Sequence, residues 1–195
     1  MKKIVLTSTL VMTVIAGAFA QTTWTVDKAH SKVGFSVEHL VISETEGNFK
    51  EFDGKIVSQN DDFVNSEIEF EIAVASIDTD IEDRDNHLKS ADFFDAAKYK
   101  NITFKGKNLK KIDGKNYKLV GNLTIKDVTR EVELDVVFNG IVIDPWGNTK
   151  AGFKLNGVIN RFDYGLKWNT LTEAGGLVVG EEVAIEVKFE LAKQG

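Results

Sequence analysis

The chain has 195 residues with 24 basic and 30 acidic side chains, and it contains no cysteine. No stretch of it is strongly basic, so no nucleic-acid partner is predicted, because binding to a phosphate backbone needs a clustered positive surface. The lack of cysteine excludes disulfides, a lipid-anchored lipoprotein start, thiolate metal sites and a cysteine nucleophile, so a buried core must hold the fold together.

The first twenty residues have the three parts of a secretory signal peptide. Lys2 and Lys3 form the basic start, residues 4–15 are largely apolar, and Ala18-Phe19-Ala20 supplies a small-x-small cleavage site. Cleavage there would leave residues 21–195 as one domain with 22 basic and 30 acidic side chains. The pattern predicts a periplasmic or secreted protein. No integral membrane segment is predicted, since no later stretch approaches the roughly 20 apolar residues of a membrane helix.

Apolar and polar residues alternate with a period of two through most of the remaining chain. In residues 66–76, for example, Ile68, Phe70 and Ile72 fall on one face and three glutamates fall on the other, as in a half-buried antiparallel strand. The predicted strands are 24–26, 32–39, 49–57, 66–76, 102–107, 117–125, 132–142, 151–159 and 183–191. Turns are predicted at Asp53-Gly54, Asp113-Gly114-Lys115, Lys126-Asp127, Trp146-Gly147-Asn148 and Gly175-Gly176.

A long connection with helix signals interrupts these strands after residue 76. Thr79 and Glu82 have the spacing of a capping box, and Ser90 followed by Asp92 can cap a second short turn. These signals predict two helical pieces within one crossover, at residues 80–89 and 91–98.

Eight or nine strands with one apolar face each would close into a barrel or pack as a sandwich. A barrel of about eight strands has an interior that side chains fill or that holds one small ligand. The crossover can cover one end of such a barrel, with Phe93 and Phe94 as its plug. The alternative is that both rings pack on the outside of the sheet.

Six stretches of the sequence form a pattern whose order and spacing are specific: WTVDKAHSKVGFSVEHL (24–40), EGNFKEFDG (46–54), SIDTDIEDRDNHLKSADFFDAAKY (76–99), ITF (102–104), GNLTIKDVTREVEL (121–134) and NRFDYG (160–165). Taken together, they resemble the YceI-like, polyisoprenoid-binding proteins over nearly all of residues 21–195. Lys100 stands where that family usually has proline, and Asp127 stands where a turn glycine is common. Neither departure threatens the fold, because aspartate tolerates a left-handed backbone and lysine only loosens a turn.

The resemblance implies an all-β fold: a closed antiparallel lipocalin-like barrel of about eight strands with a short helical crossover. It also implies an elongated apolar cavity for a polyisoprenoid lipid, such as a polyprenyl phosphate or an isoprenoid quinone, held for transport or storage. Such binding relies on burial of apolar surface, worth roughly 25 cal/mol per Å², and needs no catalytic group or cofactor. The residues expected to contact the ligand are Phe35, Val37, His39, Phe70, Phe93, Phe94, Leu123, Val136, Phe138, Phe153, Arg161, Ile185 and Val187.

Two of these residues are polar and share the parity of inward-facing apolar side chains. His39 continues the alternation that contains Phe35, and Arg161 continues the alternation that contains Phe153. Near a strand end, a guanidinium could meet the phosphate oxygens of a lipid head group. The alternative is a salt bridge at the barrel rim between Arg161 and Asp163 or another carboxylate.

Residues for metal binding or catalysis are sparse. The three histidines, His30, His39 and His87, match no metal-binding spacing, so we expect them to bond turn backbone or carboxylates and predict no metal site. No GxSxG motif occurs, and no enzyme is predicted. An enzyme and a stress-related structural or interaction barrel with a filled core remain alternatives. The sequence also leaves open whether a homodimer forms.

Overall fold

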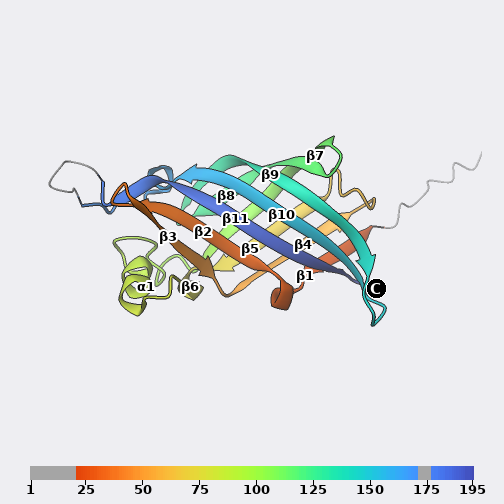
Figure 1. Ribbon diagram of the computed structural model, residues 1–195, viewed down its shortest axis with the longest axis horizontal. Coiled ribbons are helices and arrows are strands. Elements are labelled where there is room, and N and C mark those ends of the chain that lie inside the picture. Colours follow the sequence, from red (N-terminus) through yellow and green to blue (C-terminus); the bar gives the residue numbers. More distant parts are fainter. Residues whose placement is uncertain (1–20, 171–176) are drawn as a thin grey trace, which may run out of the picture.

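A computed structural model describes residues 21–170 and 177–195. The predicted signal peptide and the predicted Gly175-Gly176 turn lie outside these residues. Within the described part of the chain, the strand segments join one antiparallel sheet that closes on itself (Figure 1). The fold is therefore the barrel and not the sandwich. No helix in these two ranges is long and apolar enough to cross a membrane.

Eleven strand segments make eight barrel strands, because β1 and β2, β3 and β4, and β5 and β6 are halves of three bent strands. Along one edge, β11 pairs first with β2 and then with β1. On their other edges, β2 pairs with β3 and β1 pairs with β4. The elements are β1 (Thr22–Val26), η1 (Lys28–His30), β2 (Lys32–His39), β3 (Ser43–Phe49), β4 (Phe52–Ser58), β5 (Glu67–Ala73), η2 (Val74–Ser76), β6 (Ile77–Asp78), α1 (Glu82–Lys89), β7 (Asn101–Asp113), β8 (Asn116–Ile125), β9 (Val128–Ile143), β10 (Thr149–Asn160), η3 (Arg161–Tyr164) and β11 (Val179–Lys193).

The bends explain two of the differences between the predicted strands and the observed ones. The predicted strand 49–57 spans the junction of β3 and β4, and the predicted strand 66–76 runs past the end of β5 into η2. At the first junction the buried positions pass from Phe49 to Phe52, so the inward parity shifts by one residue, as it does at a β-bulge. Asp53-Gly54 lies inside β4, so the turn predicted there was wrong.

Three other predicted turns connect strands as expected: Asp113-Gly114-Lys115, Lys126-Asp127 and Trp146-Gly147-Asn148. Gly114 and Gly147 have positive φ angles of 43° and 88°, which glycine adopts without steric cost. In the turn between β8 and β9 the left-handed residue is Lys126, with φ of 57°. The assignment of that conformation to Asp127 was wrong.

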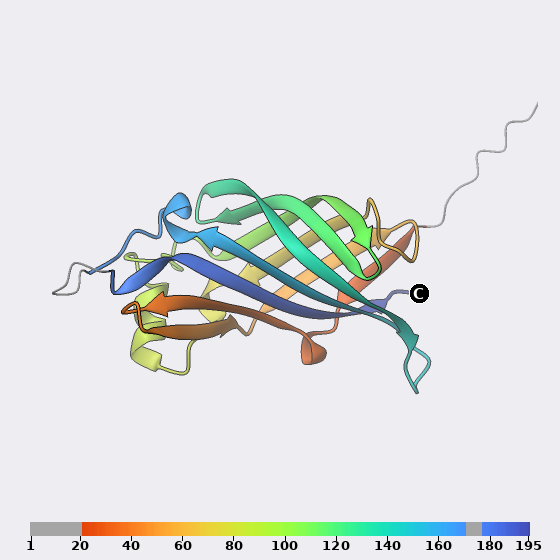
Figure 2. The same ribbon diagram turned by 45° about the horizontal axis from the view of Figure 1, so that its top comes forward.

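The crossover contains one helix and a series of turns. Helix α1 confirms the first predicted helical piece, whereas residues 91–98 form turns, so the second piece was wrong. The predicted capping box does not form. Instead, the backbone N–H and the hydroxyl of Thr79 donate to Oδ1 of Asp85, at 2.8 and 2.6 Å. The helix lies at one end of the barrel (Figure 2).

The other end of the barrel is filled by aromatic rings. Phe63, on the loop between β4 and β5, is completely buried, and its ring centroid lies 5.1 Å from that of Trp24 and 5.0 Å from that of Phe153. Phe138 contacts both Phe63 and Phe153, at centroid distances of 5.4 and 4.9 Å. This loop and α1 lie at opposite ends (Figure 1), so the aromatic cluster fills the barrel end away from α1.

Candidate ligand-binding site

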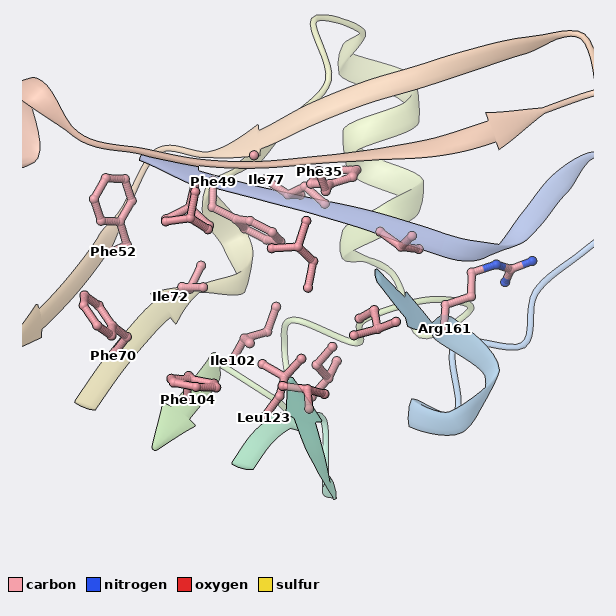
Figure 3. A pocket seen from close by; sticks show the side chains of 18 of the residues that line it. Phe35, Phe49, Phe52, Phe70, Ile72, Ile77, Ile102, Phe104, Leu123 and Arg161 are labelled. Atoms are coloured by element: carbon pink, nitrogen blue, oxygen red, sulfur yellow. The ribbon is translucent and has the colours of Figure 1, made fainter. Parts of the chain in front are cut away.

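The half of the barrel beside α1 contains a cavity of about 190 Å³ (Figure 3). The described residues that line it are apolar apart from Arg161, and eight of them are phenylalanines. Along β11 the lining runs from Val179 to Phe189, a length of about 30 Å at the usual rise of a strand. A small volume spread over this length makes the cavity a narrow slot.

Most of the residues predicted to contact a ligand line this slot. They are Phe35, Val37, Phe70, Phe93, Phe94, Leu123, Arg161, Ile185 and Val187. Val136, Phe138 and Phe153 face the interior but lie in the filled half and do not line the slot, so their contact with a ligand stays a prediction. His39 pairs with Val179 at a strand end and also does not line the cavity. Alternation predicts which side of the sheet a residue faces, but not its depth along the barrel.

Several residues that line the cavity were not among the predicted ligand contacts. Phe189 and Leu119 have inward parity in predicted strands and could have been found from that signal. The Phe189 ring stacks on Phe70 with a centroid distance of 4.5 Å and an interplanar angle of 2°. Leu88 and Leu166 lie outside the strands, in α1 and after η3, where alternation gives no signal.

Phe93 and Phe94 both line the cavity, so the alternative in which these rings pack outside the sheet is wrong. The Phe93 ring lies against His87 and Trp168, at centroid distances of 5.1 and 5.2 Å. Nζ of Lys126, in the β8–β9 turn, donates to the backbone oxygen of Phe93 at 3.1 Å. The crossover is therefore attached to the barrel wall at the α1 end of the cavity.

Arg161 presents its aliphatic stem to the cavity and its guanidinium points away from the apolar rings (Figure 3). The group is buried, and it donates hydrogen bonds to four backbone oxygens: those of Gly180 at 2.7 Å, Leu166 at 2.5 Å, Trp168 at 2.9 Å and Val179 at 3.0 Å. These acceptors are backbone oxygens and not carboxylates, so the alternative of a salt bridge from Arg161 to Asp163 or another carboxylate was wrong.

The surroundings of Arg161 follow from the NRFDYG stretch. The Asn160 side chain caps η3 by accepting from the backbone N–H of Phe162 at 2.9 Å, and Gly165 ends η3 with a positive φ of 75°. Burial lowers the pKa of Arg161, and the nearby Glu181 carboxylate opposes that shift. The side chain is still charged, because a guanidinium stays protonated in proteins. Its positive charge therefore serves to tie the segment after η3 to the start of β11.

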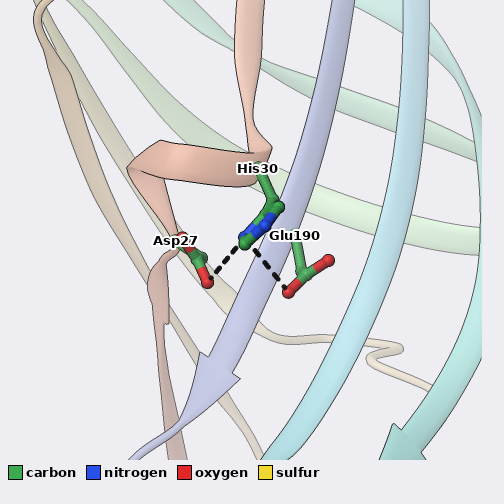
Figure 4. A group of neighbouring side chains, drawn as sticks. All are labelled: Asp27, His30 and Glu190. Carbon is green, nitrogen blue, oxygen red and sulfur yellow. Dashed lines mark ion pairs between the residues drawn. The ribbon is translucent and has the colours of Figure 1, made fainter. Parts of the chain in front are cut away.

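A cluster of charged groups lies on the outside of the barrel, where η1 bends the first strand (Figure 4). Nδ1 of His30 is 3.2 Å from Oδ2 of Asp27 and 3.8 Å from Oε1 of Glu190. These three residues could geometrically surround a metal ion. However, Nζ of Lys150 lies 2.6 Å from the same Asp27 oxygen and 3.3 Å from the same Glu190 oxygen. An ammonium already pairs with both carboxylates, so we interpret the cluster as an ion-pair network between β10, β11 and η1.

Two histidines contact carboxylates as predicted. His30 contacts Asp27, and Nε2 of His87 lies 3.1 Å from Oδ2 of Asp92. The contact between His30 and Glu190 joins residues far apart in the sequence, so spacing could not reveal it.

The fold and the cavity define a class of protein: a closed eight-stranded, lipocalin-like antiparallel barrel with an apolar slot at one end. The YceI-like domain model matches residues 24–191, and the chain therefore belongs to the YceI-like family. The UPF0312 protein SA2479 of Staphylococcus aureus (strain N315) is 38% identical over 172 residues, which are 88% of this chain and 98% of that protein.

Solved structures share the fold. The Campylobacter jejuni YCEI protein is 35% identical with a TM-score of 0.69, and the match covers 87% of this chain and 97% of that one. A polyisoprenoid binding domain from Saccharophagus degradans is 14% identical with a TM-score of 0.62, covering 88% of this chain and 98% of that one. At this identity the second likeness concerns the fold alone.

We predict that Asp27→Asn lowers the free energy of unfolding at neutral pH by about 2 kcal/mol. The pKa of Asp27 is lowered from 3.8 to about 2, chiefly by the hydrogen bond from Lys150, and each pKa unit corresponds to about 1.4 kcal/mol. Because the folded-state pKa is depressed, this stabilisation is present above about pH 4 and is lost as the pH falls toward 2.

Urea unfolding of the wild type and the variant across this pH range measures the effect. The difference between the two proteins should shrink below about pH 4. Asp53→Asn is a matched control, because the Asp53 carboxylate pairs with Lys28 but is 68% exposed, and it should change stability little. A difference for Asp27→Asn that does not vary with pH would contradict the assignment.

Proposed function

We propose that this protein binds the hydrocarbon chain of an isoprenoid lipid in the slot beside α1, for transport or storage. The observation that carries the proposal is the lining of the cavity, which is apolar apart from Arg161, and that guanidinium already donates to four backbone oxygens, two of them on the lining residues Leu166 and Val179. With those donors engaged, the described part of the wall offers a ligand mainly apolar surface, so recognition comes chiefly from burial of that surface. The polyisoprenoid binding domain from Saccharophagus degradans, with the same fold, supports this choice of ligand.

Apolar burial alone can supply useful affinity. Every 100 Å² of hydrocarbon surface removed from water contributes about 2.5 kcal/mol before the entropic cost of ordering the chain. The cavity volume of about 190 Å³ is below the roughly 300–1,000 Å³ of pockets for drug-sized ligands. A chain of many isoprene units therefore extends past the α1 end or displaces lining rings. The alternative is a structural or interaction barrel whose core is filled by side chains. That description fits the half of the barrel that contains Phe63, but not the half beside α1.

We predict that Val37→Phe weakens binding of a fluorescent farnesyl probe at least tenfold. Val37 lines the cavity, so the added ring occupies space that the ligand needs. Phe138→Leu is the matched control, because it lowers stability in the filled half and should leave the affinity unchanged. Titration of each variant and a thermal melt give the two readouts. Unchanged affinity in a correctly folded Val37→Phe protein would place the ligand elsewhere.

Arg161 distinguishes recognition of the tail from recognition of a charged head group. The guanidinium of Arg161 donates to four backbone oxygens, and Arg161→Met leaves these acceptors without donors. We therefore expect the variant to lower the free energy of unfolding by about 3 kcal/mol. The affinities for a prenyl phosphate and for the matching prenyl alcohol should then change by the same factor. Loss of the phosphate ligand alone would show instead that Arg161 binds the head group. Arg161→Lys, which keeps the charge, provides the comparison if the methionine variant folds poorly.

We also propose that the protein acts outside the cytoplasm after cleavage following Ala20. The support is the basic, apolar and small-residue pattern of residues 1–20. Cell fractionation with intact-mass measurement tests this: the exported protein should begin at Gln21, and deletion of residues 1–20 should leave it in the cytoplasm. A full-length mass in the exported fraction would contradict cleavage.

A further inference from the structure

Two phenylalanines of the cavity wall lie directly over glycines of the neighbouring strand. Phe35 pairs with Gly47 across β2 and β3, and Phe70 pairs with Gly54 across β4 and β5. A Cβ atom placed on Gly54 would lie 2.1 Å from Cδ1 of Phe70, and one placed on Gly47 would lie 2.4 Å from Cζ of Phe35. Each ring thus occupies the space that a side chain on the opposite residue would need.

A third ring repeats the arrangement on a diagonal. Phe104 pairs with Leu123, two residues along β8 from Gly121, and a Cβ atom on Gly121 would lie 2.3 Å from Cζ of Phe104. The three rings come from β2, β5 and β7, and all of them line the cavity (Figure 3). The contact between ring and glycine therefore recurs around the wall.

Space, and not backbone conformation, requires glycine at these positions. Gly47, Gly54 and Gly121 lie within β3, β4 and β8, and none of the three has a positive φ angle. Glycine inside a strand is destabilising by roughly 0.5–1 kcal/mol relative to alanine and often marks a close approach of another group. Here the approaching group is an aromatic ring that lies along the wall instead of across the barrel.

We propose that Gly47, Gly54 and Gly121 set the bore of the slot, so that it accepts one extended apolar chain and excludes fused-ring lipids. This inference rests on the proposed function for the kind of ligand. A methyl group on any of these glycines displaces its ring, and the free space beside the ring is the cavity of about 190 Å³. A slim chain passes between rings held flat, whereas the rigid width of a sterol nucleus does not.

Gly54→Ala is the sharpest test, because the three atoms nearest to the added methyl group all belong to the Phe70 ring. The variant should bind a fluorescent farnesyl probe at least tenfold more weakly than the wild type. Adding Phe70→Leu should restore most of the affinity by removing the displaced ring. Gly152→Ala is the matched control in β10, where the new methyl group would meet Asn139 at an ordinary 3.4 Å, and its affinity should not change. The wild type should not bind a fluorescent sterol.

The outcomes separate this inference from the proposed function. If the wild type binds the farnesyl probe and Gly54→Ala binds it equally well, the bore role is overturned and the lipid site stands. The bore role is also overturned if Phe70→Leu restores nothing, or if the wild type binds the sterol as tightly as the farnesyl probe. If the wild type binds no prenyl probe, both proposals fall. If Gly54→Ala does not fold, Gly47→Ala repeats the comparison in a Thr79→Ser background, with and without Phe35→Leu, because the added methyl group would also lie 2.8 Å from Cγ2 of Thr79. A crystal structure of the variant should show the Phe35 ring turned into the cavity.

Discussion

The interior of an eight-stranded barrel has to be filled, and side chains or a ligand must do it. This chain fills the two halves of its barrel differently. In one half, Phe63 enters from a loop and packs with Trp24, Phe138 and Phe153 into a closed aromatic cluster. In the other half the rings lie along the wall, and glycines such as Gly54 provide the space for them to do so. The cavity is thus a consequence of where the bulky side chains rest and not of a lack of them.

The charged groups of the protein lie where they leave that cavity apolar. Lys150, Asp27 and Glu190 join the bent first strand to β10 and β11 on the outside of the barrel. Arg161 is buried, but its donors are taken by backbone oxygens of the segment after η3 and of β11, so its charge does not face the slot. Both groups hold the barrel closed, and the interior is left to contacts that favour hydrocarbon over water.

The sequence predicts strands with one buried face through period-two alternation over most of the chain, and its resemblance to the YceI-like family favours the barrel over the sandwich. It also predicts that Phe35, Phe70 and Ile185 face inward. It could not separate them from Phe138, which has the same inward parity but lies in the filled half, because depth depends on the register between strands. The wrong turn prediction at Asp53-Gly54 has a related cause. The reason for glycine at position 54 is the Phe70 ring, and only the pairing of β4 with β5 brings that ring opposite Gly54. Alternation likewise contains no sign that the guanidinium of Arg161 would find backbone acceptors.

The central claim is that an isoprenoid lipid occupies the slot. Native mass spectrometry of the protein isolated from its own cells, followed by organic extraction and mass analysis of what is released, tests it most directly. The account predicts one lipid for each protein molecule, with an apolar tail built of isoprene repeats, and loss of that lipid from the Val37→Phe protein isolated in the same way. A protein that carries no lipid and takes up no prenyl probe when one is supplied would contradict the account.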